Sequence, residues 1–75
     1  MVTYEEALKK ARQLKTTIDN CTEYENGFVF GSMADGLSDG TNTPCVILKE
    51  NGDAVNMPWF VISGMGREIR SFSVE

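Results

Sequence analysis

Histidine is missing from this 75-residue sequence, and its absence narrows the chemistry that the chain can perform. Histidine is the commonest general base and the commonest metal ligand in proteins, and a cysteine nucleophile usually depends on one. The sequence also has no Walker A motif, no Gly-x-Ser-x-Gly elbow and no His-Glu-x-x-His pair. We therefore expect no enzymatic activity, and we predict no catalytic residue, no metal site and no cofactor.

Cysteine is scarce as well, with two residues in the chain. Cys21 and Cys45 are too far apart in sequence for a Cys-x-x-Cys motif, which argues against a redox or zinc site. In a reducing compartment we expect two free thiols that pack as small hydrophobic groups. A disulfide between them is the alternative, because both are predicted near the starts of strands.

Long apolar segments are also absent. No segment reaches the roughly 18 consecutive apolar residues of a membrane-spanning helix. The first ten residues, MVTYEEALKK, lack the apolar centre of a signal peptide. These two absences predict a cytoplasmic protein with no membrane partner.

Basic residues are fewer than acidic ones, seven against eleven, and the net charge is −4. Residues 1–18 hold four basic residues against two acidic ones, which gives +2, whereas residues 19–75 hold three against nine, which gives −6. An acidic body with one mildly basic segment is a poor electrostatic match to a phosphate backbone. Nucleic acid is therefore not the partner that we expect first.

The sequence does contain the elements of one small folded domain, residues 1–75, since 41% of its residues are hydrophobic and 24% are charged. Residues 3–17 predict an amphipathic helix. Thr3 and Glu6 have the spacing of a capping box, and apolar residues follow at helical intervals. These apolar residues are Tyr4, Ala7, Leu8, Ala11, Leu14 and Ile18.

Residues 44–57, PCVILKENGDAVNM, predict a β-hairpin. Two apolar runs flank Asn51-Gly52, a dipeptide that favours the type I′ turn of a two-residue loop. In that register one face of the hairpin is entirely apolar and comprises Val46, Leu48, Val55 and Met57. A three-residue loop at 50–52 is the alternative, and it pairs Ile47 with Val55.

The other apolar segments predict the remaining strands. Phe28-Val29-Phe30 is the centre of a strand within residues 21–33, and both phenylalanines should face the helix. Residues 21–24 are either an irregular lead-in or a separate first arm. Residues 67–74 alternate as a final strand, and residues 34–43 form a loop rich in Gly and Asp. The predicted class is α+β, with one N-terminal helix packed on an antiparallel sheet of three or four strands.

A dense apolar run at residues 59–62 follows Pro58, which cannot donate to a strand ladder. One interpretation is that the run folds back as a turn and plugs the open end of the core. The other is that part of the run stays exposed and anchors a partner or a second copy of the chain, because large aromatic side chains are favoured at interfaces. The candidate partner-binding residues are Trp59, Phe60 and Met65.

The order of these features carries a resemblance. An amphipathic helix is followed by FVF, a Gly/Asp loop and the segment PCVILKENGD. This layout resembles small bacterial and prophage α+β proteins and is similar in outline to immunity protein 35-type domains. The resemblance implies a helix that leads into a three- or four-stranded antiparallel sheet and a binding or neutralising role, and it identifies no functional residue.

The function that we expect is that of a small interaction module, immunity-like or prophage-encoded, which binds a protein partner or itself. The alternative is an accessory protein that binds nucleic acid through basic residues. Those residues are Lys9, Lys10, Arg12, Arg67 and Arg70. A phosphate-binding surface loses affinity steeply as the salt concentration rises, and this separates the two hypotheses.

Overall fold

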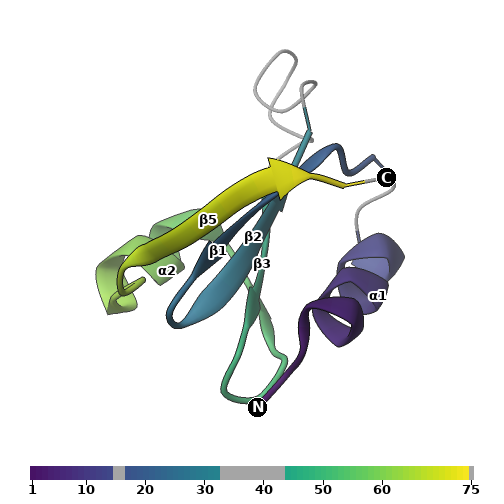
Figure 1. The fold of residues 1–75 in the computed structure, drawn as a ribbon. Helices are drawn as coiled ribbons and strands as arrows, with labels where there is room; N and C mark the ends of the chain where they lie inside the picture. Colours follow the sequence, from purple (N-terminus) through teal and green to yellow (C-terminus); the bar gives the residue numbers. More distant parts are fainter. Residues whose placement is uncertain (15–16, 33–43, 75) are drawn as a thin grey trace.

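The computed structural model describes residues 1–14, 17–32 and 44–74. Within them the chain forms two helices and one antiparallel sheet of five strands (Figure 1). The elements are α1 (Tyr4–Leu14), β1 (Asn20–Tyr24), β2 (Gly27–Gly31), β3 (Cys45–Leu48), β4 (Ala54–Val55), α2 (Met57–Ser63) and β5 (Glu68–Ser73). The predicted α+β class is confirmed, with the N-terminal helix packed on the sheet. The predicted loop at 34–43 lies outside the described residues.

The sheet has five strands and not three or four because residues 21–24, for which two interpretations were open, form a separate strand. Residues 21–24 belong to an arm of their own, β1, which pairs with β2 and leaves Glu25 and Asn26 as the connection. The other side of β1 pairs with β5, so that the strand order is β4-β3-β2-β1-β5. The final strand therefore forms one edge of the sheet, and the two-residue β4 forms the other.

Helix α1 begins at the predicted cap. The Glu6 N–H donates to Thr3 Oγ1 at 3.3 Å and the Thr3 N–H donates to Glu6 Oε1 at 3.2 Å, which is the reciprocal pattern of a capping box. The described part of the helix runs to Leu14, and Thr17, the predicted end, is not helical. Asp19 already donates its N–H to the Gly31 carbonyl at 2.8 Å, so the chain must have left the helix before it reaches β1.

The main core lies between α1 and one face of the sheet. Phe28 and Phe30 are buried in it, as predicted, and the Tyr4 ring lies 6.0 and 6.2 Å from theirs, measured between centroids. Ala7 and Ala11 are fully buried, and their small side chains let the helix approach the strands closely. Partly buried residues pack around this centre, among them Val2, Leu8, Ile18, Phe72 and Val74.

The register of the strands keeps the two cysteines apart. Cys21 and Cys45 both pair with Phe30, from opposite sides of β2. Neighbouring strands lie about 4.8 Å apart, so the two Cα atoms are separated by roughly 10 Å, beyond the reach of a disulfide. Neither cysteine is part of a disulfide, as predicted. Burial raises the pKa of Cys21 to about 12, which keeps this thiol protonated at neutral pH.

The hairpin of β3 and β4 has neither of the predicted registers. Val46 pairs with Val55, and the Leu48 N–H donates to the Asp53 carbonyl at 2.9 Å, so the loop contains the four residues 49–52. Gly52, at φ 78°, occupies the last loop position, where a left-handed conformation is needed. The true register differs from the preferred one by two residues, so Val46 and Val55 still share a face. Their face is opposite to the one that packs against α1.

Tertiary contacts explain the longer loop. Lys49 donates its N–H to the Asn26 carbonyl at 3.1 Å and accepts at its own carbonyl from the Val2 N–H at 2.8 Å. These two bonds keep the backbone of Lys49 beside Asn26 and Val2. Lys49 therefore does not pair with Asp53, as it would in a tighter hairpin. The Asn51 side chain then accepts from the Asp53 N–H at 2.9 Å and stabilises the loop locally.

Helix α2 packs on the second face of the sheet (Figure 1). Asn56 caps it by accepting from the Trp59 N–H at 2.8 Å, and Pro58 lies in the first turn, where no intrahelical N–H is needed. Gly64 ends it at φ 104°. Phe60 is the buried residue of this helix, and its ring packs edge-on against Tyr24 at a centroid distance of 5.8 Å.

Gly27 provides the space in which Phe60 packs, and Gly27→Ala is expected to destabilise the fold. A Cβ at this position would lie 3.0 Å from the Ile47 carbonyl oxygen and 3.0 Å from Phe60 Cζ. Overpacking of this kind costs about 1–3 kcal/mol in the free energy of unfolding. Urea denaturation measures the loss, and a Gly27→Ala, Phe60→Leu double variant tests its origin. Full additivity of the two costs would contradict the expected clash with the phenyl ring.

Candidate functional site

Helix α2 exposes most of its apolar side chains. Its four consecutive large apolar residues, 59–62, are spread around the helix at 100° steps, so only one of them can point directly at the sheet. That residue is Phe60, which is 1% exposed. Ile62 is 86% exposed. Around the helix axis Ile62 lies between Trp59 and Val61, which are 48% and 54% exposed. We call Trp59, Val61 and Ile62 the α2 patch.

A hollow of about 560 Å³ adjoins the α2 patch, and we call it the α2 groove. It lies between α2, the β3–β4 loop and the β1–β2 connection. Its walls include Glu25, Asn26, Leu48, Glu50, Trp59 and Phe60. Phe60 and Leu48 supply apolar surface to this groove, and Trp59 forms part of its outer wall.

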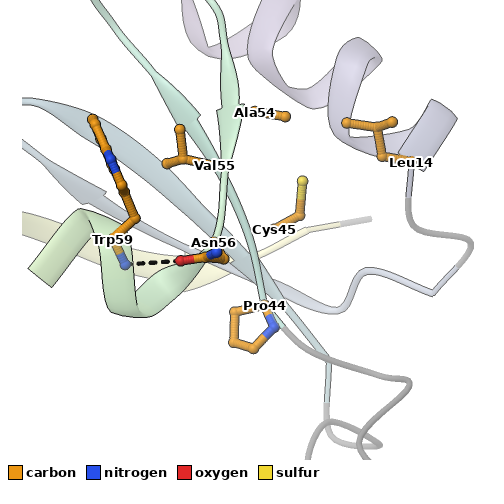
Figure 2. Close-up of a pocket in the computed structure, with 7 residues that line it drawn as sticks. All are labelled: Leu14, Pro44, Cys45, Ala54, Val55, Asn56 and Trp59. Carbon is orange, nitrogen blue, oxygen red and sulfur yellow. Dashed lines mark hydrogen bonds between the residues drawn. The ribbon is translucent and has the colours of Figure 1, made fainter.

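Trp59 also borders a second hollow, of about 480 Å³, at the β4 edge of the sheet (Figure 2). Figure 2 shows the indole beside Val55 of β4, with Cys45 and Leu14 further along the same hollow. One half-exposed indole therefore separates two concave surfaces. A ligand in either hollow could therefore contact the indole.

The β1–β2 connection holds the floor of the α2 groove in place. Asn26 binds the α2–β5 connection at two points: its side-chain amide donates to the Gly64 carbonyl at 2.9 Å and its N–H donates to the Met65 carbonyl at 3.2 Å. Glu25 adds a third tie, because its carboxylate accepts from the Arg67 N–H at 2.7 Å. The end of α2 is thus fastened to the sheet by backbone and side-chain bonds.

The structure places the three predicted partner-binding residues differently. Trp59 lies at the surface, Phe60 lies beneath the helix and supports that surface without forming part of it, and Met65 is partly buried in the α2–β5 connection. Ile62, the most exposed residue of the run, was not among the predicted residues. The sequence did hold a signal for it, since Asn56 followed by Pro58 is typical of a helix start, and helical spacing puts Ile62 opposite the buried face.

On the α1 side of the sheet, Glu23 joins two basic residues that sequence reasoning did not connect with it. Lys49 Nζ lies 2.7 Å from Glu23 Oε2, and Arg70 Nε lies 2.8 Å from Glu23 Oε1. The two cations also lie over aromatic rings, Lys49 over Phe28 at 5.0 Å and Arg70 over Phe72 at 4.8 Å. The hydrogen bond from Lys49, and then that from Arg70, lower the pKa of the Glu23 carboxyl.

This ion cluster predicts a loss of stability in acid. Because the folded-state pKa of Glu23 is lowered, its contribution is present above the unfolded-state pKa of about 4.3 and is lost as the pH falls through the folded-state value. The free energy of unfolding of the wild type should therefore drop more between pH 6 and pH 3 than that of Glu23→Gln. Glu6, whose pKa is lowered by its bonds to Thr3, titrates in both proteins and cancels in the comparison. Equal drops would show that the cluster does not act in the folded state.

The basic residues proposed for nucleic-acid binding do not share one surface. Lys9 and Lys10 lie on α1, which covers one side of the sheet, whereas Arg67 lies in the connection between β5 and α2, the helix on the other side (Figure 1). The charge of Arg70 is paired with Glu23. Arg12 lies on α1 with the two lysines. The five residues are therefore divided between the two sides of the sheet and do not form one continuous basic track along a phosphate backbone.

The described residues offer little for other chemistry. In residues 1–14, 17–32 and 44–74, no group of three or more cysteine, aspartate and glutamate residues could hold a metal ion. Neither of the helices found there is long and apolar enough to cross a membrane. The α2 patch and its groove are thus the most distinctive surface in this part of the chain.

Comparison with known proteins adds no relative. No protein-family model, no curated protein and no solved structure matches the chain. The similarity to immunity protein 35-type domains therefore stays a prediction.

Proposed function

We propose that this chain is a small protein-interaction module that binds its partner through the α2 patch. The observation that carries the proposal is that α2 buries one of its four consecutive large apolar side chains and leaves the other three 48–86% exposed. Fully burying such a side chain contributes about 1.5–3 kcal/mol, so a partner that covers the patch gains a substantial driving force. Contiguous apolar patches on small monomers are often functional for this reason.

The patch is also held in a defined shape before binding. Asn56 and Gly64 fix the two ends of α2, Phe60 anchors it from below, and Asn26 ties its C-terminal end to the sheet. A side chain that is already positioned loses little conformational entropy on binding. Trp59 in particular combines a large apolar area with few rotatable bonds, which is why tryptophan is enriched among the residues that dominate binding energy.

The test is affinity capture from cells that carry the gene, followed by binding measurements with the purified captured protein. We expect Ile62→Ser to reduce the affinity at least about tenfold, because it removes the most exposed apolar side chain of the patch. The matched control is Ile69→Ser, the same chemical change at a 53% exposed residue of β5, at the opposite edge of the sheet from β4. The control should bind like the wild type.

Two outcomes would oppose the proposal. If the captured partner binds Ile62→Ser as tightly as wild type, the α2 patch is not the interface. If the captured material is nucleic acid, and its affinity falls steeply with salt and with Lys9→Ala and Lys10→Ala, the alternative function takes its place.

A further inference from the structure

We infer that the partner inserts a positively charged segment with one large apolar side chain into the α2 groove. This inference rests on the proposed function and names the class of partner that the same site would select. The groove offers two separate kinds of recognition, an apolar floor and an acidic rim, and the two have to be matched by one ligand.

The apolar part of the groove is formed by Phe60, Leu48 and Trp59. Phe60 is fixed by its edge-on contact with Tyr24, Leu48 is partly buried, and the indole of Trp59 is half-exposed. A hollow of about 560 Å³ with such walls accepts a leucine-, methionine- or phenylalanine-sized side chain. That side chain is the anchor that we assign to the partner.

The acidic rim consists of Glu25 and Glu50, which lie on either side of the groove in the β1–β2 connection and the β3–β4 loop. Both residues are exposed. Lys49 is the basic side chain among the described lining residues, and its ammonium group is bonded to Glu23 on the other side of the sheet. Met1 also lines the groove. The rim presents the carboxylate of Glu50, together with that of Glu25, one oxygen of which already accepts from the Arg67 N–H.

The charge of the chain as a whole acts in the same direction, since its net charge is −4. A field of this sign speeds the approach of a cationic segment and opposes that of an acidic one. Specificity for a basic partner then follows from both the near and the distant charges.

A second copy of the chain fits the site less well. The three exposed side chains of the α2 patch offer on the order of 400 Å², so two patches packed together would bury on the order of 800 Å², below the roughly 1,000 Å² of a stable interface. Such a pairing would also bring two pairs of carboxylates, Glu25 and Glu50, toward one another. Area and charge thus both favour a basic partner over self-association.

The experiment uses three synthetic peptides of equal length, acetylated and amidated, titrated into the ¹⁵N-labelled full chain. The first is Lys-Lys-Gly-Leu-Gly-Lys-Lys, the second replaces every lysine by glutamate, and the third replaces the leucine by serine. We expect the first alone to shift the Trp59 indole signal and the amides of Glu50 and Ser63. Glu50→Gln should weaken this binding about two- to fivefold, as expected for one exposed ion pair, and the control Glu5→Gln on α1 should leave it unchanged.

Each contrary outcome identifies which claim fails. Equal binding of the basic and acidic peptides would overturn the inference and leave apolar docking, and with it the proposed function, intact. Equal binding of the peptide without leucine would remove the apolar anchor. No shift with any peptide, while a captured partner still depends on Ile62, would overturn the groove as the site. Shifts that follow protein concentration without peptide would show that a second copy occupies the patch.

Discussion

Replacing Phe60 by alanine is expected to remove most of the stability of this domain. The side chain is 1% exposed and is the single buried residue of α2. Truncating a buried phenylalanine costs about 3–5 kcal/mol in the free energy of unfolding. A core in a chain of this size rarely supplies more than roughly 3–5 kcal/mol in total, so the variant should be largely unfolded or have lost α2 from the sheet.

The matched control is Ile62→Ala, two residues further along the same helix. Ile62 is 86% exposed, and its truncation should change the free energy of unfolding by less than about 0.5 kcal/mol. Urea denaturation followed by circular dichroism measures both variants, and Trp59 fluorescence reports on α2 itself. Similar costs for the two substitutions would mean that α2 does not dock as the structure describes.

The dependence of α2 on one side chain has a consequence for binding. Local stability follows buried apolar contact, and a seven-residue helix with one buried residue belongs to the weaker parts of the fold. The bonds from Asn26 to Gly64 and Met65 compensate at one end, and the Asn56 cap compensates at the other. The α2 patch is therefore positioned by polar contacts at its ends as much as by packing beneath it.

Local rules predicted much of this fold from the sequence. The capping box of Thr3 and Glu6, the burial of Phe28 and Phe30 and the alternation of the last strand each depend on residues close together in the chain. Such features are decided by short hydrogen bonds and by side-chain period. They are visible before any tertiary contact is known.

The hairpin register could not be predicted in the same way. Asn51-Gly52 suits a tight turn, but it lies in the second half of a four-residue loop, because Lys49 is bonded to Asn26 and Val2. Asn56 also has a second role as the cap of α2, which shortens β4 to two residues. The partners of Lys49 lie 23 and 47 positions away from it, and Asn56 caps an element that the sequence did not predict.

Only part of the candidate site was predicted, because the sequence was not recognised as helical after Asn56. The surplus of apolar residues after Pro58 was visible in the sequence, and Trp59 is exposed, as one of the two interpretations of that run expected. Which neighbour is buried depends on the side-chain period, 2 in a strand and 3.6 in a helix. The helical period buries Phe60 and exposes Ile62, and the cap at Asn56 that produces this period was not recognised.

The second large effect is expected at Ile47, on the hairpin face opposite to the one that the sequence predicted to be entirely apolar. Ile47 is fully buried between α1 and the sheet, beside Ala7, Ala11 and Phe28. Ile47→Ala should therefore cost about 2–5 kcal/mol in the free energy of unfolding. Leu48 points to the α2 side and is partly buried, so Leu48→Ala should cost roughly 1–2 kcal/mol.

The comparison between these neighbours decides which face holds the main core. The sequence alone favoured Leu48, because its face carried an unbroken set of apolar residues. The structure favours Ile47, because α1 covers its face along two turns while the short α2 covers the other face only around Phe60. Urea denaturation of the two alanine variants at one pH measures both costs. If Leu48→Ala lowers the free energy of unfolding more than Ile47→Ala does, α2 contributes more to the core than its single buried side chain indicates. In that case α2 packs more deeply on the sheet, and less of the α2 patch is exposed for binding.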